Sequence, residues 1–170
     1  ARRGAIFHQF KCFDNGKFNI ADLEAKMKED AEKYGSVRVI LNFPQNPSGY
    51  SPTKEEAKEI CKVVKNIAES GKKIIVLSDD AYFGLNYEEN IEPQSLFAYM
   101  ADIHENVLAI KADGPTKEDF AWGFRAGFIT FASKGLNDKQ IEALTTKFMA
   151  AIRSSVSCSS TPSQSMVLHA

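Results

Sequence analysis

Apolar residues recur along this chain with two different periods, and these periods predict strands and helices in turn. Short runs of β-branched and aliphatic residues at 37–41, 74–77 and 107–110 are typical of buried strands. A fourth strand is predicted at about 126–131. Between these runs the apolar residues return every three or four positions, which is the spacing along one face of a helix. The chain therefore alternates the two kinds of element along most of its length.

The first long helix is marked at both of its ends. Thr53 and Glu56 have the spacing of a capping box, in which each side chain bonds the backbone of the other residue. Gly71 stands where this helix is expected to stop. The positions predicted for its buried apolar face are Ala57, Ile60, Cys61, Val64, Ile67 and Ala68.

Three further helices are predicted from caps and apolar spacing. One begins after Asn19, which is a favourable N-cap residue, and another covers about 96–103. The last is a long amphipathic helix with Asn137 and Gln140 at its start. Its buried apolar stripe is expected to consist of Ile141, Leu144, Phe148 and Ile152.

The order of these elements predicts the fold class. Strand and helix alternate as in βαβ units, whose right-handed crossovers produce a parallel sheet. The strands are almost wholly apolar, which is expected of a sheet that is covered on both faces. We therefore expect an α/β protein with three layers, α/β/α, around a mainly parallel sheet.

Composition and charge restrict the possible partners. The 170 residues are 44% hydrophobic and 25% charged, with 21 basic and 22 acidic residues and a formal net charge of -1. This balance provides no strongly basic surface for nucleic acid or anionic lipid. The longest apolar runs are too short to span a bilayer, and the first residues show no signal-peptide pattern. We expect neither a nucleic-acid partner nor a membrane partner.

Cysteine and histidine residues are few and dispersed. The three cysteines are odd in number and form no Cys-x-x-Cys pair, so neither a disulfide framework nor a zinc site is expected. The three histidines are equally scattered, and we expect no metal site. This cysteine usage is typical of a reducing compartment, and it predicts a cytoplasmic protein.

Polar side chains collect in the loops beside the predicted strands. The segments 42–49, 78–82 and 111–117 each follow a strand, and the segment 123–127 leads into the fourth strand. In open α/β sheets, ligands bind beyond the carboxyl ends of the strands. We therefore expect these amide, carboxylate, phenol, hydroxyl, amine and guanidinium groups to form a small-molecule site at one edge of the sheet.

Four short motifs in these loops, taken in order, resemble the class I/II aminotransferases, which are fold-type I pyridoxal phosphate (PLP) enzymes. The motifs are Asn46-Pro47-Ser48-Gly49, Asp79-x-Ala81-Tyr82, Thr116-Lys117 and Gly123-x-Arg125-x-Gly127. The interval of eight residues between Lys117 and Arg125 also agrees with that family. The resemblance extends from about residue 13 to the carboxyl end. Each motif alone is a weak signal, and the ordered set carries the resemblance.

The resemblance implies that pyridoxal 5'-phosphate is the cofactor and that Lys117 holds it. Lys117 would form the Schiff base with the cofactor and would then act as the base that moves the α-proton of the substrate. Asp79 would keep the pyridine nitrogen of the cofactor protonated, so that the ring can withdraw electrons. Asp79 is preferred to Asp80 because it stands three residues before Tyr82, and because strand alternation turns Asp80 away.

Five further contacts with the cofactor follow from the same resemblance. Asn46 and Tyr82 would bond its phenolic oxygen, and Ala81 would lie against the pyridine ring. Arg125 would bind the phosphate with its fork of donors, and Thr116 would add a hydroxyl contact. Taken singly, these residues also have ordinary structural roles, such as a turn asparagine, a core tyrosine or a surface ion pair.

The chain departs from the family pattern in two respects. Gly114 stands three residues before the lysine, where many relatives have a serine that helps to bind the phosphate. In addition, the upstream glycine-rich loop, the aromatic residue that stacks on the cofactor and the substrate-binding arginine of the small domain are not recognisable. We therefore expect residues 1–170 to be the central part of the PLP-binding large domain, with the N-terminal part and the small C-terminal domain absent. Such a piece is expected to be inactive alone.

The resemblance implies a transaminase that passes an amino group between an α-amino acid and a 2-oxo acid, and a homodimer. Two alternatives stay open at the level of sequence. One is a PLP-dependent lyase of the same fold, because the cofactor contacts would be the same. The other is an aminotransferase-like ligand-sensing domain of a transcription regulator, which a helix-turn-helix upstream would reveal. A partial sheet is also expected to self-associate through its exposed strand edges and apolar surface.

Overall fold

A computed structural model describes residues 4–169 of the chain. Four strands form one sheet in the order β3-β4-β5-β6. Strands β3, β4 and β5 are parallel, and β6 runs antiparallel to β5. Each predicted strand is confirmed, with bounds that differ from the expected ones by three residues at most. The observed bounds are β3 Ser36–Asn42, β4 Lys73–Asp79, β5 Val107–Asp113 and β6 Phe128–Ala132.

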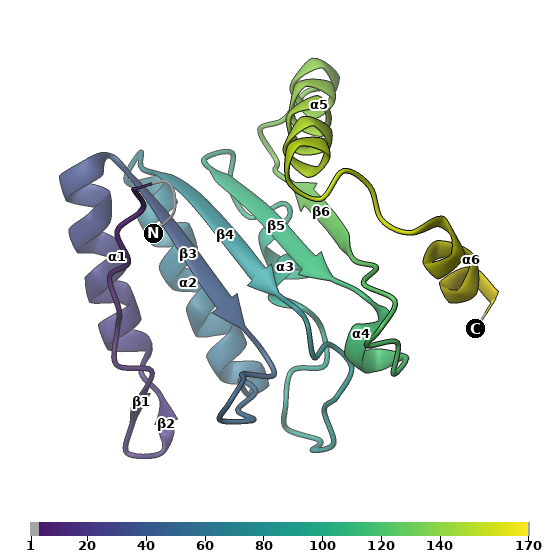
Figure 1. The fold of residues 1–170 in the computed structure, drawn as a ribbon. Coiled ribbons are helices and arrows are strands. Elements are labelled where there is room, and N and C mark those ends of the chain that lie inside the picture. Colours follow the sequence, from purple (N-terminus) through teal and green to yellow (C-terminus); the bar gives the residue numbers. More distant parts are fainter. Residues whose placement is uncertain (1–3, 170) are drawn as a thin grey trace.

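Three helices cover one face of this sheet (Figure 1). They are α1 (Ile20–Tyr34), α2 (Lys54–Glu69) and α3 (Leu96–Met100). Successive side chains of a strand point to opposite faces. Val37, Val39 and Leu41 of β3 are buried toward the helices, whereas Arg38 and Ile40 are exposed on the other face. The hydrophobic core therefore lies between the sheet and these three helices.

The predicted helix caps are formed in the structure. The Thr53 hydroxyl accepts a hydrogen bond from the Glu56 backbone N–H at 3.2 Å, and the Glu56 carboxylate accepts one from the Thr53 N–H at 2.8 Å. Asn19 accepts a hydrogen bond from the Asp22 N–H at 3.1 Å at the start of α1. All of the positions predicted for the apolar face of α2 are buried, and Val63 is buried with them. Local signals and burial therefore agree along α2.

A short hairpin and three more helices complete the part of the chain that the structure describes. The one-turn helix α4 was not predicted; it follows β5 directly and has Pro115 at its first position, where the missing N–H costs nothing. No helix among residues 4–169 is both long enough and apolar enough to cross a membrane. The remaining elements are β1 (Phe13–Asp14), β2 (Lys17–Phe18), α4 (Pro115–Glu118), α5 (Asp138–Ser155) and α6 (Thr161–His169).

The long helix α5 differs from its prediction. None of its residues is buried, and Ile141 and Ile152 of the predicted stripe are 43% and 39% exposed. It contacts the sheet at the edge strand β6, where the ring of Phe148 stacks on that of Phe131, 5.3 Å away between centroids. Phe131 pairs with Ile110 on the face opposite to α1–α3. The predicted α/β class and mainly parallel sheet are confirmed. The prediction of a buried stripe is wrong, because Leu144 and Phe148 are only half-buried and Ile141 and Ile152 are exposed.

Candidate functional site

The carboxyl ends of the parallel strands bring the predicted motifs to one edge of the sheet (Figure 1). In the strand register Asn42 pairs with Asp79, and Asp79 pairs with Ala112. Strand β6 begins at the same edge because it runs in the opposite direction, and its Phe128 pairs with Asp113. The loops that follow β3, β4 and β5 therefore meet the loop that precedes β6.

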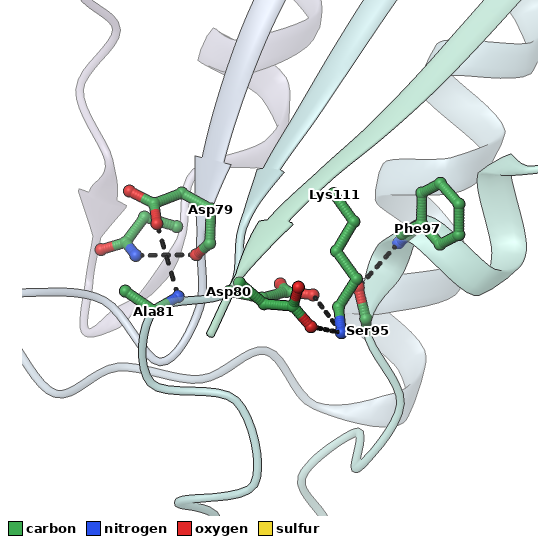
Figure 2. Close-up of polar contacts among 8 residues, drawn as sticks. Asp79, Asp80, Ala81, Ser95, Phe97 and Lys111 are labelled. Carbon is green, nitrogen blue, oxygen red and sulfur yellow. Dashed lines mark hydrogen bonds and ion pairs between the residues drawn. The ribbon is translucent and has the colours of Figure 1, made fainter. Parts of the chain in front are cut away.

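Two consecutive aspartates at the end of β4 point to opposite faces of the sheet (Figure 2). Asp80 continues the buried row that includes Ser78, and it is only 5% exposed. Asp79 is half-buried on the other face, and its Oδ1 accepts a hydrogen bond from the Ala81 N–H at 3.4 Å. Asp79 is therefore the carboxylate of this pair that a ligand on the open face would meet.

Asn42, the last residue of β3, connects two of the loops. Its Nδ2 donates a hydrogen bond to the Asp79 carbonyl oxygen at 2.9 Å, and its Oδ1 accepts one from the Asn46 N–H at 2.9 Å. Asn42 therefore fixes the Asn46 loop to the end of β4. It was not among the predicted site residues, although an amide at the last position of an apolar strand is a signal for such a role.

Three of the predicted residues are in contact although they come from three different segments. The Asn46 Nδ2 donates a hydrogen bond to the Tyr82 hydroxyl at 3.3 Å. The Lys117 Nζ lies over the Tyr82 ring, 5.3 Å from its centroid, which is within the range of a cation–π interaction. An amide, a phenol and an amine are thus brought together at the edge of the sheet.

The other two predicted polar residues lie on the same β5–β6 connection. Thr116 is half-buried and lies beside Lys117 in α4. Arg125 is exposed and has a φ of 54°, in the left-handed region that residues other than glycine seldom adopt. Its Nη1 donates a hydrogen bond to the Trp122 carbonyl oxygen at 3.2 Å. Within residues 4–169, neither Thr116 nor Arg125 forms a side-chain hydrogen bond with another predicted site residue.

The backbone contacts of Gly114 explain why this position has no side chain. A Cβ atom on Gly114 would lie 2.8 Å from the Ala126 carbonyl oxygen and 2.9 Å from the Gly127 Cα, both of which are backbone atoms. A Cβ atom on Gly127 would in turn lie 3.3 Å from the Asp113 carbonyl oxygen. The end of β5 and the start of β6 therefore pass in direct contact. A serine at position 114 could not reach a ligand without displacing this part of the chain.

The fold and the polar groups at the carboxyl ends of its strands define a class of protein. The class is an open α/β sheet that presents an amine, a phenol and a carboxylate beyond the carboxyl ends of its strands, where small cofactors bind. A model of the family described as aminotransferase class I and II matches residues 1–170. The chain therefore belongs to the class I and II aminotransferase family, in agreement with the resemblance of its motifs.

The chain spans less than a third of the curated relatives described next. A probable N-acetyl-LL-diaminopimelate aminotransferase of Bacillus subtilis (strain 168) is 30% identical over 148 residues, which are 87% of this chain and 32% of that protein. A kynurenine–oxoglutarate transaminase of Dictyostelium discoideum is 33% identical over 84 residues, which are 49% of this chain and 18% of that protein. The chain thus spans no more than 32% of either of these relatives.

Solved structures share the fold. The crystal structure of an aminotransferase from Anaerococcus prevotii DSM 20548 matches with a TM-score of 0.83 and 24% identity, over 94% of this chain and 39% of that chain. An alanine aminotransferase from Pyrococcus furiosus matches with a TM-score of 0.62 and 26% identity, over 91% of this chain and 34% of that chain. The first likeness supports the arrangement of the elements, and the second relates the chain to a named aminotransferase.

Proposed function

We propose that this chain carries the pyridoxal phosphate site of a transaminase, which passes an amino group between an α-amino acid and a 2-oxo acid. The observation that carries the proposal is the contact of Asn46, Tyr82 and Lys117 at the carboxyl edge of the sheet. These residues belong to three separate motifs of the family to which the chain belongs. Their convergence gives the motifs a common site.

The chemical groups at this edge fit pyridoxal phosphate. The cofactor has an aldehyde, a phenolic oxygen and a pyridine nitrogen around one ring, and the site offers an amine, two hydrogen-bond donors and a carboxylate. Bound in this way, the cofactor withdraws electrons from the Cα of an amino acid attached to it. Asp79 would face the pyridine nitrogen and keep it protonated by its negative charge, and Asn42 would hold the backbone of Asp79 in place.

Asn46 and Tyr82 would both bind the phenolic oxygen of the cofactor. Their side chains already lie 3.3 Å apart, so one acceptor placed beside both could receive a hydrogen bond from each. Ala81, between Asp79 and Tyr82, has a methyl group that leaves room for a flat ring. These contacts would set the tilt of the ring and the direction in which its aldehyde points.

Lys117 would attach the cofactor and then move a proton at the substrate Cα. Both tasks require the neutral amine, since an ammonium has no lone pair for attack or for accepting a proton. Its Nζ lies over the ring of Tyr82, whose hydroxyl accepts a hydrogen bond from Asn46, so all three groups could contact one ligand. We therefore assign Lys117 as the catalytic residue.

Arg125 and Thr116 would bind the phosphate of the cofactor. Arg125 has a planar fork of donors that matches phosphate oxygens, and it uses Nη1 to bond the Trp122 carbonyl. Within residues 4–169, the other donors of this exposed guanidinium form no hydrogen bond, so they could bind an anion. Position 114 supplies no hydroxyl, so the phosphate would rely on Arg125, Thr116 and backbone N–H groups of α4.

A lyase of the same fold and a ligand-sensing regulatory domain are less well supported than a transaminase. The two relatives and the Pyrococcus furiosus structure described above carry aminotransferase or transaminase names. We further propose that residues 1–170 are the central part of a larger PLP-binding domain, in a cytoplasmic homodimer. In support of a larger domain, the chain matches only 39% of the longer Anaerococcus prevotii chain, which shares its fold.

Trapping of the cofactor on the lysine tests the proposal. The protein is incubated with pyridoxal phosphate, reduced with borohydride and digested, and the modified lysines are mapped by peptide mass spectrometry. A dominant adduct on Lys117, absent from Lys117→Ala and retained in Lys134→Ala, is the expected result. Lys134 is exposed and lies in the turn after β6, so it serves as the matched control. Adducts scattered over many lysines, without preference for Lys117, would contradict the proposed site.

A further inference from the structure

The half-buried Lys111 lies on the helix-covered side of the sheet and is not used by the proposed chemistry. Lys111 belongs to β5, in the row of side chains that includes the buried Val107 and Ala109. This row faces α3 and the core, so Lys111 points away from the face that carries Asp79. Its side chain is 17% exposed. A charged group in such a row needs partners, because burial of an unpaired charge is costly.

The ammonium of Lys111 has three partners. It lies 3.8 Å from Asp80 Oδ2, it donates a hydrogen bond to Asp113 Oδ2, and it lies over the ring of Phe83, 4.5 Å from the centroid. Asp80 and Asp113 are 5% and 23% exposed in their side chains. Figure 2 shows the carboxylate of Asp80 directed toward the ammonium on the side of the sheet away from Asp79.

These partners are the sequence neighbours of the proposed cofactor residues. Asp80 follows Asp79, and Phe83 follows Tyr82. Asp113 is the last residue of β5, and the chain continues from it into α4, which carries Lys117. The Lys111 side chain therefore contacts both the segment that presents Asp79 and Tyr82 and the segment that presents the amine.

We propose that Lys111 is a positioning residue for the cofactor site, holding the ends of β4 and β5 at a fixed separation so that Tyr82 and Lys117 stay in contact. This inference rests on the proposed function of the same site. Lys111 touches neither the cofactor nor the substrate; it acts through Asp80, Phe83 and Asp113.

The charges around Asp80 agree with this role. Burial raises the pKa of Asp80, while a hydrogen bond with Ser95 and the charge of Lys111 lower it. The neighbouring carboxylates of Asp113 and Asp79 raise it further. Loss of the ammonium would leave Asp80 beside the carboxylates of Asp113 and Asp79 without the positive charge of Lys111. The residue would then bind a proton or turn outward, and either change would disturb the chain next to Asp79.

The experiment separates positioning from simple stabilisation by means of four variants of the 170-residue chain. Lys111→Met removes the charge and keeps the apolar stem, whereas Lys111→Arg keeps a charge in the same place. The double variant Lys111→Met/Asp80→Asn removes both members of the buried pair. Lys65→Met is the matched control, because Lys65 pairs with Glu69 at 3.7 Å on the exposed surface of α2.

The quantities measured are the thermal unfolding midpoint and the fraction of Lys117 trapped by borohydride, over a range of pyridoxal phosphate concentrations and pH. Trapping at low cofactor concentration is expected to fall on the order of tenfold in Lys111→Met, because misplaced groups no longer meet the ring together. The double variant is expected to regain the unfolding midpoint without regaining the trapping. Lys111→Arg is expected to recover most of the trapping, and Lys65→Met to match the unchanged chain.

The outcomes also separate this inference from the proposed function. If the unchanged chain labels Lys117 and a folded Lys111→Met or double variant labels it equally, with the same pH profile, the positioning role is overturned. If Lys111→Met does not fold, the double variant decides the question by the same comparison, and loss of trapping in a folded Lys111→Arg would also contradict the proposed role. If the unchanged chain itself shows no preference for Lys117, the proposed function fails, and the positioning role fails with it.

Discussion

Gly114 lies where the end of β5 touches the start of β6, and the backbone there leaves no space for a side chain. Gly114→Ser would place a Cβ atom within 3 Å of the Ala126 and Gly127 backbone. Overpacking of this kind is expected to lower the free energy of unfolding by about 1–3 kcal/mol. Urea denaturation followed by circular dichroism measures the change.

Gly123→Ser is the matched control for that substitution. Gly123 belongs to the same connection, has no heavy atom within 4 Å of an added Cβ and lacks a positive φ. The free energy of unfolding of the Gly123→Ser variant is expected to stay within about 0.5 kcal/mol of that of the unchanged chain. Equal losses in the two variants would show that flexibility, and not contact with Ala126 and Gly127, makes glycine necessary at position 114.

Residues with a motif signal could be given individual roles from the sequence, whereas residues that depend on strand register could only be placed in the loops around the site. Asn46, Tyr82 and Lys117 stand in short patterns whose residue types are set by the chemistry of a cofactor. Asn42 and Lys111 stand in no such pattern, and their roles depend on which strand end lies beside them. That information comes from the pairing of β3 with β4 and of β4 with β5. The sequence placed Lys111 in a loop because the predicted strand stopped at 110, three residues too early.

At the level of elements, the start of α2 is held by a carboxylate that has several donors. Glu56 accepts hydrogen bonds from the Tyr50 hydroxyl at 2.6 Å and from the Thr53 N–H at 2.8 Å. Burial works against its charge, but the hydrogen bonds outweigh burial and lower the pKa of Glu56 below its ordinary value of 4.5. Glu56 therefore contributes stability that is present above pH 4.5 and is lost as the pH falls through the lowered pKa.

Glu56→Gln is expected to remove this part of the acid sensitivity while keeping the capping box, in which glutamine also serves. Between about pH 6 and about pH 3, the variant should lose less free energy of unfolding than the unchanged chain does. Urea denaturation at the two pH values measures both losses. Glu59→Gln, on the exposed side of the same helix, is the control and should follow the unchanged chain. Equal losses of free energy of unfolding in all three proteins would show that other carboxylates cause the loss of stability at low pH.

Two long helices of similar length should differ in how firmly they are held. Helix α2 buries seven residues against the core, whereas α5 buries none and stacks on the sheet through Phe148. A helix without buried contacts has little to oppose local opening. Hydrogen exchange measured by mass spectrometry should therefore be faster in the peptides of α5 than in those of α2. Equal protection of the two helices would indicate that α5 is covered in solution, for example by another copy of the chain.

At the scale of the whole molecule, the face of the sheet opposite to α1–α3 carries exposed apolar side chains. Ile40 and Ile129 on this face are 55% and 46% exposed, and Leu77 and Ile110 lie half-buried between them. Contiguous apolar surface of this kind favours association. The 170-residue chain is expected to associate as its concentration rises, and sedimentation velocity at several concentrations measures this.

Ile40→Lys should shift that association to higher concentration, because it places a charge on the apolar face, at the edge strand β3. Tyr87→Lys is the control, since Tyr87 is 88% exposed in the loop after β4, away from the sheet. A chain that stays monomeric at every concentration would contradict the prediction. An equal effect of the two lysines would show that net charge, and not the sheet face, controls association.

The same face shows how far the fold could be predicted from the sequence. The strands and α2 were predicted correctly because their apolar residues pack together in the core between the sheet and α1–α3. The apolar stripe of α5 has the same periodicity, but among residues 4–169 Phe148 stacks on Phe131 while Ile141 and Ile152 stay exposed. Periodicity reports which face of a helix is apolar, and it does not report whether that face is covered.

The contact between Gly114 and the start of β6 also limits the order in which this sequence can change during evolution. A serine at this position would require a different path for the chain at the start of β6. A single substitution at 114 would not reach that state, since it meets the backbone of Ala126 and Gly127. A change that moves this backbone would have to come first. Positions 114 and 127 should therefore vary together among descendants of this sequence, although they are thirteen residues apart.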